Sequence, residues 1–350
     1  MNARRLHGLT AAGAALLMIV GIGTVSSQSA QELYVCHAGS LQSAFSAVEK
    51  VFTTRYPHVV VKDVSGGSVA LAGRMAAGTQ ACDVFAAADY LDIDLLLKPA
   101  ALADHTIVFA KGRMVLAYLA TDPEARGIAA AGAFNPPARV PNAAPDWYRV
   151  LLAPGVRIAG SHPFLDPAGY RSHMMFQLAQ AFYGVPNLSN QLLEHYTILP
   201  DVGGAGANRR ALGTDFTFQF TYEHSAAAAA KANPAYRYVT LPAQIDLSTA
   251  VNDGAYARAA VTIPAIGFPG ITSAVTIPAS RVAWGLTIPA MTQNREHAIA
   301  FVSLLLGAPG TAALTSAGPA PITPAHVTRA DYTRLPGPLQ SLVKAGDDVP

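Results

Sequence analysis

Two serines stand where a short apolar run gives way to a helical pattern. Ser40 lies in "HAGSL", directly after the run "LYVC", and Ser68 lies in "GGSVA", after the Val-rich run "VVVKDV". A helix N-terminus offers free backbone N–H groups and a partial positive charge, so it binds anions without a lysine or an arginine. Gly39 lets a ligand approach the backbone closely, and each serine hydroxyl can donate one more hydrogen bond. We call these two strand-to-helix junctions, at Ser40 and at Ser68, the serine corners, and they predict an oxyanion site.

Helix capping is the alternative explanation for each serine, because serine at an N-cap is common for stability alone. Two such corners, each directly after a strand, favour a binding site, since ligands of open α/β sheets lie beyond the carboxyl ends of strands. A third small-residue helix start, "DPAG", precedes Tyr170. Asp166 would cap that helix, with Pro167 at its first position.

The segments around these corners predict the elements that would position them. Apolar residues recur at helical spacing from Leu41 to Phe52, and Pro57 follows. Short apolar runs and helical patterns then alternate along most of the chain. This alternation predicts an α/β architecture with parallel strands, and 350 residues are enough for two domains with a large core.

Composition and motifs argue against several classes of function. A net charge of +2 and a charged fraction of 13% give no basic excess for nucleic acid. The sequence contains no G-x-S-x-G nucleophile elbow, no phosphate-loop motif and no histidine cluster with metal spacing. Its ten histidines are scattered along the chain. We therefore expect a protein that is not an enzyme, has no cofactor and does not bind nucleic acid.

Residues 1–30 have the pattern of a signal peptide. Arg4 and Arg5 precede the apolar stretch "LTAAGAALLMIVGIGTV", and small polar residues follow it. The apolar run is shorter than the roughly 20 residues of a membrane span, so we expect cleavage between Ser26 and Gln31 rather than a retained anchor. The mature protein would then be periplasmic, secreted or held at the outer cell surface.

Cys36 and Cys82 each lie in a short apolar segment that is expected to be a strand. Two interpretations stay open, namely a disulfide, which an exported protein permits, and two buried thiols. Their spacing is not that of a metal site.

Several blocks resemble the periplasmic molybdate/tungstate-binding proteins of ABC importers, in particular the subfamily that holds the tungsten atom six-coordinate. The likeness runs through "HAGSL", "GSVA", "CDVFAAADY" and "LDPAGYR", and it spans nearly the whole chain after residue 30. The resemblance implies a two-lobed periplasmic-binding-protein fold of type II. Each lobe would be a mostly parallel sheet flanked by helices, with the ligand cleft between the lobes. It also implies molybdate or tungstate as the ligand, the importer's membrane subunits as partners, and a monomer.

The resemblance assigns roles to individual residues as well. The residues implied to contact the oxyanion are Gly39, Ser40 and Ser68 from the first lobe, and Asp166, Ala168, Gly169 and Tyr170 from the second. In the six-coordinate subfamily the Asp of "LDP" bonds to the metal atom of the oxyanion, which makes Asp166 its ligand here. A bare carboxylate beside an oxyanion is repulsive, but it is favourable when it bonds to a highly charged metal centre. Sulfate and phosphate offer no such centre.

One position departs from the pattern of that subfamily. The subfamily carries a second acid in a stretch of the form D-Y-A-F-E-Y, and the nearest match here, "DFTFQF", places Gln219 at the acid. A neutral amide ligates a metal poorly but can donate a hydrogen bond to an anion. Glu223 is the alternative occupant. With Gln219 the preference for tungstate over molybdate or sulfate weakens, so a sulfate-binding protein is an alternative function.

Two more alternatives stay open, a sensor or enzyme on the same fold and a ferric-ion binder that uses Tyr170 and Tyr222. For the domains we predict one lobe at 31–117 and 285–330, a second lobe at 118–284, and a C-terminal tail at 331–350. The chain would cross between the lobes near Leu116–Thr121 and within Ala265–Leu286. Hinge motion at these crossings would close the lobes on the anion.

Overall fold

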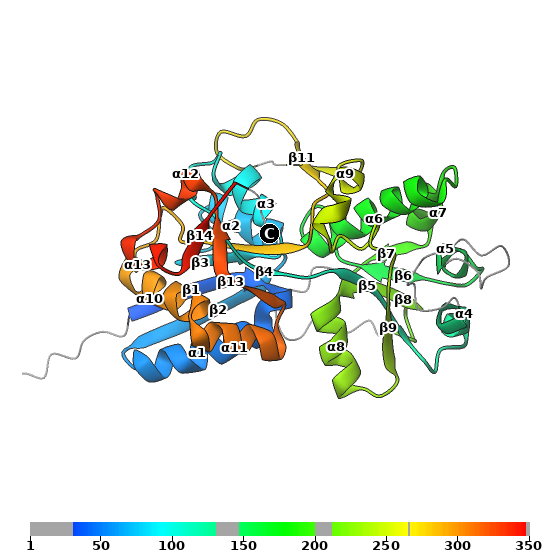
Figure 1. Cartoon of the computed structure of the whole chain (residues 1–350), viewed down its shortest axis with the longest axis horizontal. Coiled ribbons are helices and arrows are strands. Elements are labelled where there is room, and N and C mark those ends of the chain that lie inside the picture. Colours follow the sequence, from blue (N-terminus) through cyan, green and yellow to red (C-terminus); the bar gives the residue numbers. More distant parts are fainter. Residues whose placement is uncertain (1–30, 131–146, 200–211, 265–266, 348–350) are drawn as a thin grey trace, which may run out of the picture.

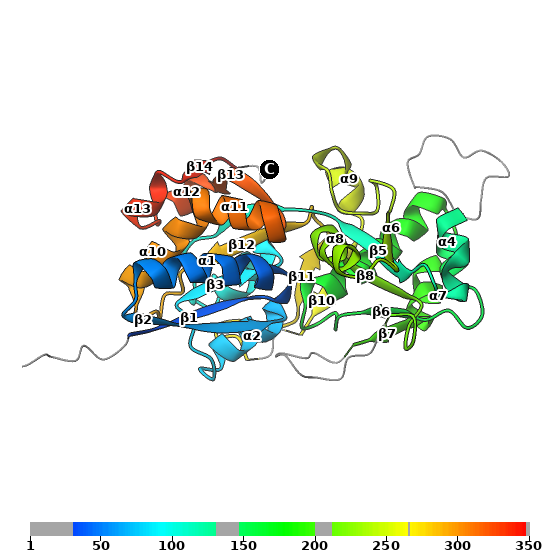
Figure 2. The same cartoon turned by 90° about the horizontal axis from the view of Figure 1, so that it is seen from below.

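The structure is a computed structural model that describes residues 31–130, 147–199, 212–264 and 267–347. The described residues form two lobes that lie side by side along the longest axis of the molecule (Figure 1), and the view from below shows the same division (Figure 2). The predicted signal segment, residues 1–30, lies outside the described residues.

The first lobe is built on a seven-stranded sheet. Its strands are β1 (Gln31–Ala38), β2 (Val59–Gly66), β3 (Val84–Ala87), β4 (Ile107–Lys111), β12 (Ala283–Thr287), β13 (Ala320–Val327) and β14 (Val343–Ala345). Their order in the sheet is β14-β13-β4-β12-β3-β1-β2. Its helices are η1 (Gly39–Leu41), α1 (Gln42–Arg55), α2 (Ser68–Ala76), α3 (Tyr90–Asp92), η2 (Ile93–Leu97), α10 (Arg295–Leu306), α11 (Ala308–Ala317), α12 (Arg329–Tyr332) and α13 (Gly337–Gln340).

The apolar spacing of α1 explains why this helix covers the first sheet. Phe45 and Phe52 are fully buried because they recur on one face of the helix. Their rings pack against Phe301 of α10, with centroids 6.1 and 5.4 Å away. Aromatic side chains bury a large apolar area, so this cluster anchors both helices on the sheet that carries the first two corners.

The second lobe is built on a five-stranded sheet. Its strands are β5 (Met114–Leu119), β6 (Ile158–Gly160), β7 (Tyr196–Ile198), β8 (Phe218–Tyr222) and β9 (Tyr236–Thr240), in the order β7-β6-β8-β5-β9. Strands β10 (Ala260–Ile263) and β11 (Val275–Pro278) form a separate antiparallel pair, in which β10 contacts α6 and β11 contacts η2 of the first lobe. The helices are η3 (Pro123–Ala125), α4 (Arg126–Ala130), α5 (Trp147–Leu151), α6 (Pro167–Tyr183), α7 (Leu188–Glu194), α8 (Glu223–Ala232), η4 (Ala250–Asn252) and α9 (Asp253–Tyr256).

The predicted α/β class and the two lobes are confirmed, but the sheets are mixed rather than mostly parallel. In the first sheet β1 pairs in parallel with β2 and β3, as a βαβ pattern requires. The returning strand β12 is antiparallel to both of its neighbours, β3 and β4. In the second sheet β5 is antiparallel to β8 and β9. Strand β12 belongs to a segment that returns to the first lobe after the chain has passed through the second. The local βαβ pattern therefore does not set the direction of this strand.

The chain passes between the two sheets at places that differ from the prediction. The first crossing lies at Gly112–Arg113, between β4 and β5, and not at Leu116–Thr121, since β5 is paired along its length with β9. The second crossing lies between β11 and β12, around Ala279–Val282, inside the predicted range. The two crossings are joined by a hydrogen bond from the Gly112 N–H to the Val282 carbonyl (3.0 Å). This bond places the two connections side by side.

The predicted C-terminal tail is also wrong for the described residues, because this part of the chain belongs to the first lobe. Strand β14 pairs in parallel with β13 at the edge of the seven-stranded sheet. The buried carboxylate of Asp331 accepts a hydrogen bond from the Thr106 N–H (3.1 Å) and contacts Lys98 Nζ (2.5 Å). The C-terminal segment therefore completes the sheet edge and ties it to β4.

Among the described residues, no single helix is both long and apolar enough to cross a membrane. Only α10 and α11 taken together reach the required length, and they meet at a bend of 60°. Both helices bury apolar side chains of the first lobe.

Cys36 of β1 and Cys82, just before β3, form a disulfide, with Cα atoms 5.6 Å apart. Of the two interpretations left open by the sequence, a disulfide and two buried thiols, the structure shows the disulfide. It also links two strands that are neighbours in the sheet.

We expect reduction of this disulfide to lower the free energy of unfolding by about 4 kcal/mol, because a loop of 46 residues is no longer closed in the unfolded chain. Urea-induced unfolding with and without reductant measures the change. The matched control is the double variant Cys36→Ala/Cys82→Ala, which should not respond to reductant. An unchanged wild-type midpoint, at a reductant concentration where a thiol assay finds both cysteines reduced, would contradict the prediction.

Candidate functional site

The two serine corners lie at one edge of the first sheet. In the parallel pair β1–β2, Ala38 is in register with Gly66, and on the other side of β1 His37 is in register with Ala86 of β3. The carboxyl ends of all three strands therefore meet, and Ser40 and Ser68 follow two of them directly. This edge is where a doubly wound sheet receives a ligand.

Neither serine caps its helix, so the capping alternative is wrong. Ser40 lies inside the short turn η1, and the N-cap of α1 is Leu41, with no side-chain cap bond. Ser68 is the first residue of α2, whose N-cap is Gly67, again with no side-chain cap bond. The two hydroxyls are held by other parts of the protein.

Both serine oxygens accept a hydrogen bond from a protein N–H group. Trp284 Nε1 donates to Ser40 Oγ (3.0 Å), and the Ala88 N–H donates to Ser68 Oγ (2.9 Å). A hydroxyl has one hydrogen to donate, and an oxygen that already accepts an N–H bond directs that hydrogen elsewhere. The two corners therefore carry O–H donors that an anion can accept from.

Gly67 brings the second lobe against the start of α2. A Cβ at this position would lie 2.5 Å from the Leu165 carbonyl oxygen and 3.3 Å from Asp166 Cβ. The same carbonyl accepts a hydrogen bond from the Ala70 N–H (3.1 Å). The segment before α6 and the first turn of α2 therefore touch across the two lobes, and only glycine fits at the point of contact.

Asp166 is the N-cap of α6, as predicted. Its Oδ1 accepts a hydrogen bond from the Ala168 N–H (2.7 Å), and Pro167 stands at the start of the helix. Gly169 is packed tightly inside the second lobe, since a Cβ there would lie 2.5 Å from the Ser161 carbonyl oxygen. The Ala168 amide and the Gly169 position thus serve the helix start, while Asp166 faces the first turn of α2 across the lobes.

Tyr170 and Arg171 join the two lobes through buried polar contacts. The Tyr170 hydroxyl donates to Asp89 Oδ2 (2.9 Å) and lies 3.2 Å from Asp92 Oδ1. Arg171 donates to the Ala88 carbonyl (2.7 Å) and forms an ion pair with Asp89 at 3.0 Å. All of these side chains are at most 2% exposed. The hydroxyl of Tyr170, a residue predicted to contact the ligand, is therefore directed at carboxylates of the first lobe.

The charges of this cluster cancel. Burial alone would lower the pKa of Arg171, but Asp89 and two tyrosines outweigh it and raise that pKa above its ordinary value, so the guanidinium stays charged. Burial and the neighbouring Asp89 raise the pKa of Asp92 well above its ordinary range, which favours the protonated form of Asp92. Burial also raises the pKa of Asp89, although the charge of Arg171 opposes that rise. Within the described residues, Asp92 Oδ2 has no hydrogen-bond partner. We therefore expect one cation to face one anion in this cluster, with no net charge left over for a ligand.

Ser40 is connected to this cluster through the end of β8. His224 Nε2 lies 2.9 Å from the Ser40 carbonyl oxygen, and the rings of Tyr222 and Trp284 pack at 4.8 Å. The Tyr222 hydroxyl accepts a hydrogen bond from Arg171 (2.8 Å). Burial raises the pKa of Tyr222 above its ordinary value. The hydroxyls of Tyr170 and Tyr222, the two ligands of the ferric alternative, contact Asp89 and Arg171 in this buried cluster.

Gln219 and Glu223, the two predicted occupants of the second-acid position, lie on β8 and at the start of α8. Gln219 is half-buried on β8, and successive residues of a strand point to opposite faces, so its side chain points away from the face that carries Phe220 and Tyr222. Glu223 pairs with Arg113 Nε at the first crossing (3.2 Å). From β8, Tyr222 reaches the buried cluster.

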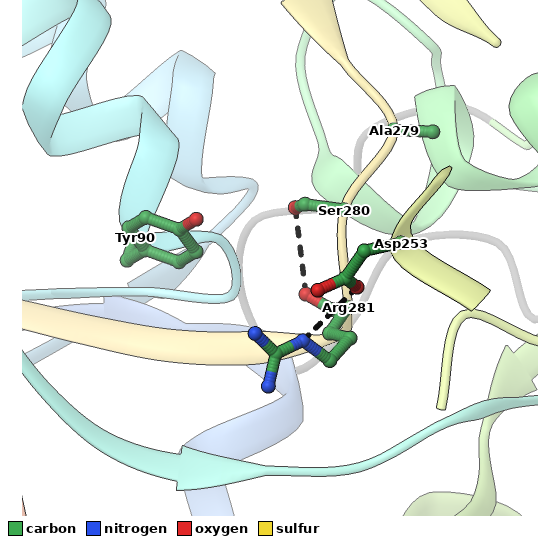
Figure 3. Close-up of a pocket in the computed structure, with 5 residues that line it drawn as sticks. All are labelled: Tyr90, Asp253, Ala279, Ser280 and Arg281. Atoms are coloured by element: carbon green, nitrogen blue, oxygen red, sulfur yellow. Dashed lines mark hydrogen bonds and ion pairs between the residues drawn. The ribbon is translucent and has the colours of Figure 1, made fainter. Parts of the chain in front are cut away.

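A separate cavity of about 140 Å³ lies at the second crossing (Figure 3). Tyr90 faces the crossing segment from the first lobe, and Asp253 approaches from α9, with its Oδ1 3.2 Å from Arg281 Nε. Ala279 and Ser280 complete the lining. None of the residues predicted for the oxyanion lines this cavity.

Several residues of the cluster were missed by the sequence analysis although they adjoin predicted ones. Arg171 follows Tyr170, and Asp89 follows the strand "CDVFAAA". Asp89 carries a charge directly after a buried strand, and Arg171 carries one on the first turns of an expected core helix. A charge at such a place needs a partner, and this signal could have identified both residues.

A family model described as bacterial extracellular solute-binding protein matches residues 33–319. The chain belongs to this family. A relative from Methanoculleus marisnigri, described as an uncharacterized solute-binding protein, is 32% identical over 335 residues, which cover 89% of this chain and 87% of the relative. The molybdate/tungstate-binding protein WtpA of Thermococcus kodakarensis is 28% identical over 341 residues, with coverage of 87% and 89%.

Solved structures share the fold of this solute-binding protein. The sulfate-binding protein SubI from Mycobacterium tuberculosis superimposes with a TM-score of 0.53, at 16% identity, over 83% of this chain and 87% of that one. This likeness shows the two-lobed fold alone.

We expect Asp89→Asn to lower the free energy of unfolding by about 3 kcal/mol, because it leaves the buried Arg171 cation without its counter-charge. Asp92→Asn is the matched control. Asp92 is equally buried, but we expect it to be neutral, so Asp92→Asn should cause no loss of stability at neutral pH. Urea-induced unfolding at neutral pH measures both variants. Equal losses in the two variants would contradict this assignment of charge.

The variant Asp92→Asn also allows a prediction of how the free energy of unfolding depends on pH. The folded protein holds a proton on Asp92 that the unfolded chain, with an ordinary pKa of 3.8, releases. This stabilising contribution is present at low pH and is lost as the pH rises above that value. Asp92→Asn lacks the effect, so its stability relative to the wild type should increase from acid to neutral pH. A constant difference across that range would show that Asp92 is not the protonated group.

Proposed function

We propose that this solute-binding protein captures molybdate or tungstate between its lobes and delivers it to an ABC importer. It would act outside the cytoplasm as a monomer, after removal of residues 1–30, and its macromolecular partners would be the importer's membrane subunits. The proposal rests first on one observation, the two hydroxyls at Ser40 and Ser68 that accept protein N–H bonds and are left with a hydrogen to donate. A site of neutral donors suits a fully ionised oxyanion.

Asp166 supports a metal oxyanion in preference to sulfate. It stands across from Gly67 at the start of α2, next to Ser68. A carboxylate at this place opposes any oxyanion by charge, unless the central atom can accept the carboxylate oxygen as a further ligand. Molybdenum and tungsten can expand their coordination in this way, whereas the sulfur of sulfate cannot. The name of the WtpA relative points to the same pair of ligands.

Sulfate binding is the second candidate function. The observations that favour it are the neutral side chain of Gln219 on β8 and the pairing of Glu223 with Arg113. With one carboxylate instead of two, less of the selectivity against sulfate remains.

Isothermal titration of the protein with tungstate, molybdate and sulfate tests the proposal. We expect the two metal oxyanions to bind at least about 100-fold more tightly than sulfate, which corresponds to about 2.7 kcal/mol. Asp166→Asn is the decisive variant because asparagine is an equally good N-cap and preserves α6. It should weaken tungstate binding by about tenfold or more and leave sulfate binding unchanged or stronger. Comparable affinities for sulfate and tungstate in the wild type would instead support the sulfate candidate.

Closure of the lobes on the ligand gives a second test. Gly67→Ala keeps an ordinary extended backbone (φ −65°, ψ 133°) but places a Cβ 2.5 Å from the Leu165 carbonyl oxygen. The lobes must then separate, so the affinity for the oxyanion should fall by about tenfold or more, or about 1.4 kcal/mol. The matched control is Gly73→Ala on the same helix, where a Cβ meets nothing within 4 Å. An unchanged affinity in Gly67→Ala would show that binding does not require this contact.

A further inference from the structure

Three side chains with metal-ligating atoms, from β1, β2 and α1, converge in the first lobe. His37 comes from β1, Asp63 from the neighbouring strand β2, and Glu49 from α1. One ligand atom from each lies within 4.8 Å of the others. Two carboxylate oxygens and one imidazole nitrogen form a donor set that suits a divalent transition metal.

The hydrogen bonds of His37 fix the orientation of its ring and direct Nε2 at the carboxylate of Asp63. Its Nδ1 lies 2.8 Å from the Ala38 carbonyl oxygen, which can only accept, so Nδ1 carries a hydrogen. Its Nε2 lies 2.6 Å from Asp63 Oδ1, the separation of a charge-assisted hydrogen bond with a proton between the two atoms. A metal ion bonded to both atoms would displace this proton and move the two atoms to about 3 Å apart. An N–H bond from the far nitrogen to a backbone carbonyl is the usual support of a metal-binding histidine.

Glu49 adds a third oxygen that the protein leaves without a partner. Its Oε1 is shielded from solvent, and no described residue donates a hydrogen bond to it. A shielded carboxylate oxygen without a donor is costly, and a metal ion would satisfy it. Asp63 is oriented as well, since Gln42 Nε2 donates to its Oδ2 (2.6 Å). Its side chain is 33% exposed, so water or an ion can reach the cluster from that side.

We propose that His37, Glu49 and Asp63 bind a single divalent transition metal ion, with zinc as the best match to their donors. The ion would take the place of the proton between His37 and Asp63 and would draw in Glu49 Oε1, with water at the remaining position. It would tie β1, β2 and α1 together two residues before Gly39. This site does not depend on the proposed oxyanion function.

Titration of the chelator-treated protein with zinc chloride, in the absence of any oxyanion under test, measures the site. We expect one zinc ion per chain by calorimetry and a rise in the thermal unfolding temperature. Asp63→Asn and Glu49→Gln change single oxygens on the rim of the cluster, and each should weaken zinc binding by about tenfold or more. Circular dichroism of the metal-free variants confirms that they are folded.

A surface pair of histidines supplies the matched control. His58 and His297 lie with ring centroids 5.5 Å apart and are the competing place for adventitious zinc. The double variant His58→Asn/His297→Asn should bind zinc as the wild type does. The proposal is overturned if the wild type binds no zinc, or if this double variant loses binding while Asp63→Asn keeps it. Because no oxyanion is present, neither result bears on the proposed transport function.

Discussion

The buried guanidinium of Arg171 is the constraint on which the arrangement of the two lobes depends. An ion removed from water costs several kcal/mol unless it is paired and fully hydrogen-bonded. Arg171 Nη1 donates to the Ala88 carbonyl at the end of β3 and to the Tyr222 hydroxyl on β8, while its buried Nη2 forms the ion pair with Asp89 and has no hydrogen bond within the described residues. One side chain of α6 thereby defines the position of three elements from both lobes, in the place where the predicted ligand residues gather.

This pairing also decides what kind of anion site the protein can offer. Because Asp89 pairs with Arg171, the buried cluster presents no spare positive charge. In the proposed function, an anion at the corners would be held by hydroxyl and amide donors and by the dipoles of the helix starts. Such sites recognise geometry and the number of acceptors, so selectivity among oxyanions would then depend on the carboxylate of Asp166.

The sequence analysis succeeded where local pattern decides structure. The βαβ unit, the serine corners and the Asp166 cap follow from short-range spacing and turn chemistry, and the structure contains all three. The first crossing was misplaced because "RMVLAYL" has the pattern of a buried strand in either lobe. The link between Tyr170 and Asp89 spans 81 residues and depends on how the lobes meet, which no local pattern encodes. The face to which Gln219 points was missed for the same reason, since it follows from the register of β8 with β5 and β6.

Gly39 and Gly67 stand at equivalent positions of the two serine corners, but different constraints act on them. At Gly67 the protein itself excludes a side chain, because the Leu165 carbonyl of the other lobe occupies the space. At Gly39 a Cβ would meet only Ser65 Oγ at 3.8 Å, an ordinary contact, so packing does not require glycine there. β1 and β2 end in register, and the two corners therefore lie beside each other. Gly67 of the second corner thus brings the two lobes into contact, whereas Gly39 of the first corner would, in the proposed function, let an anion approach the backbone beside the Ser40 hydroxyl.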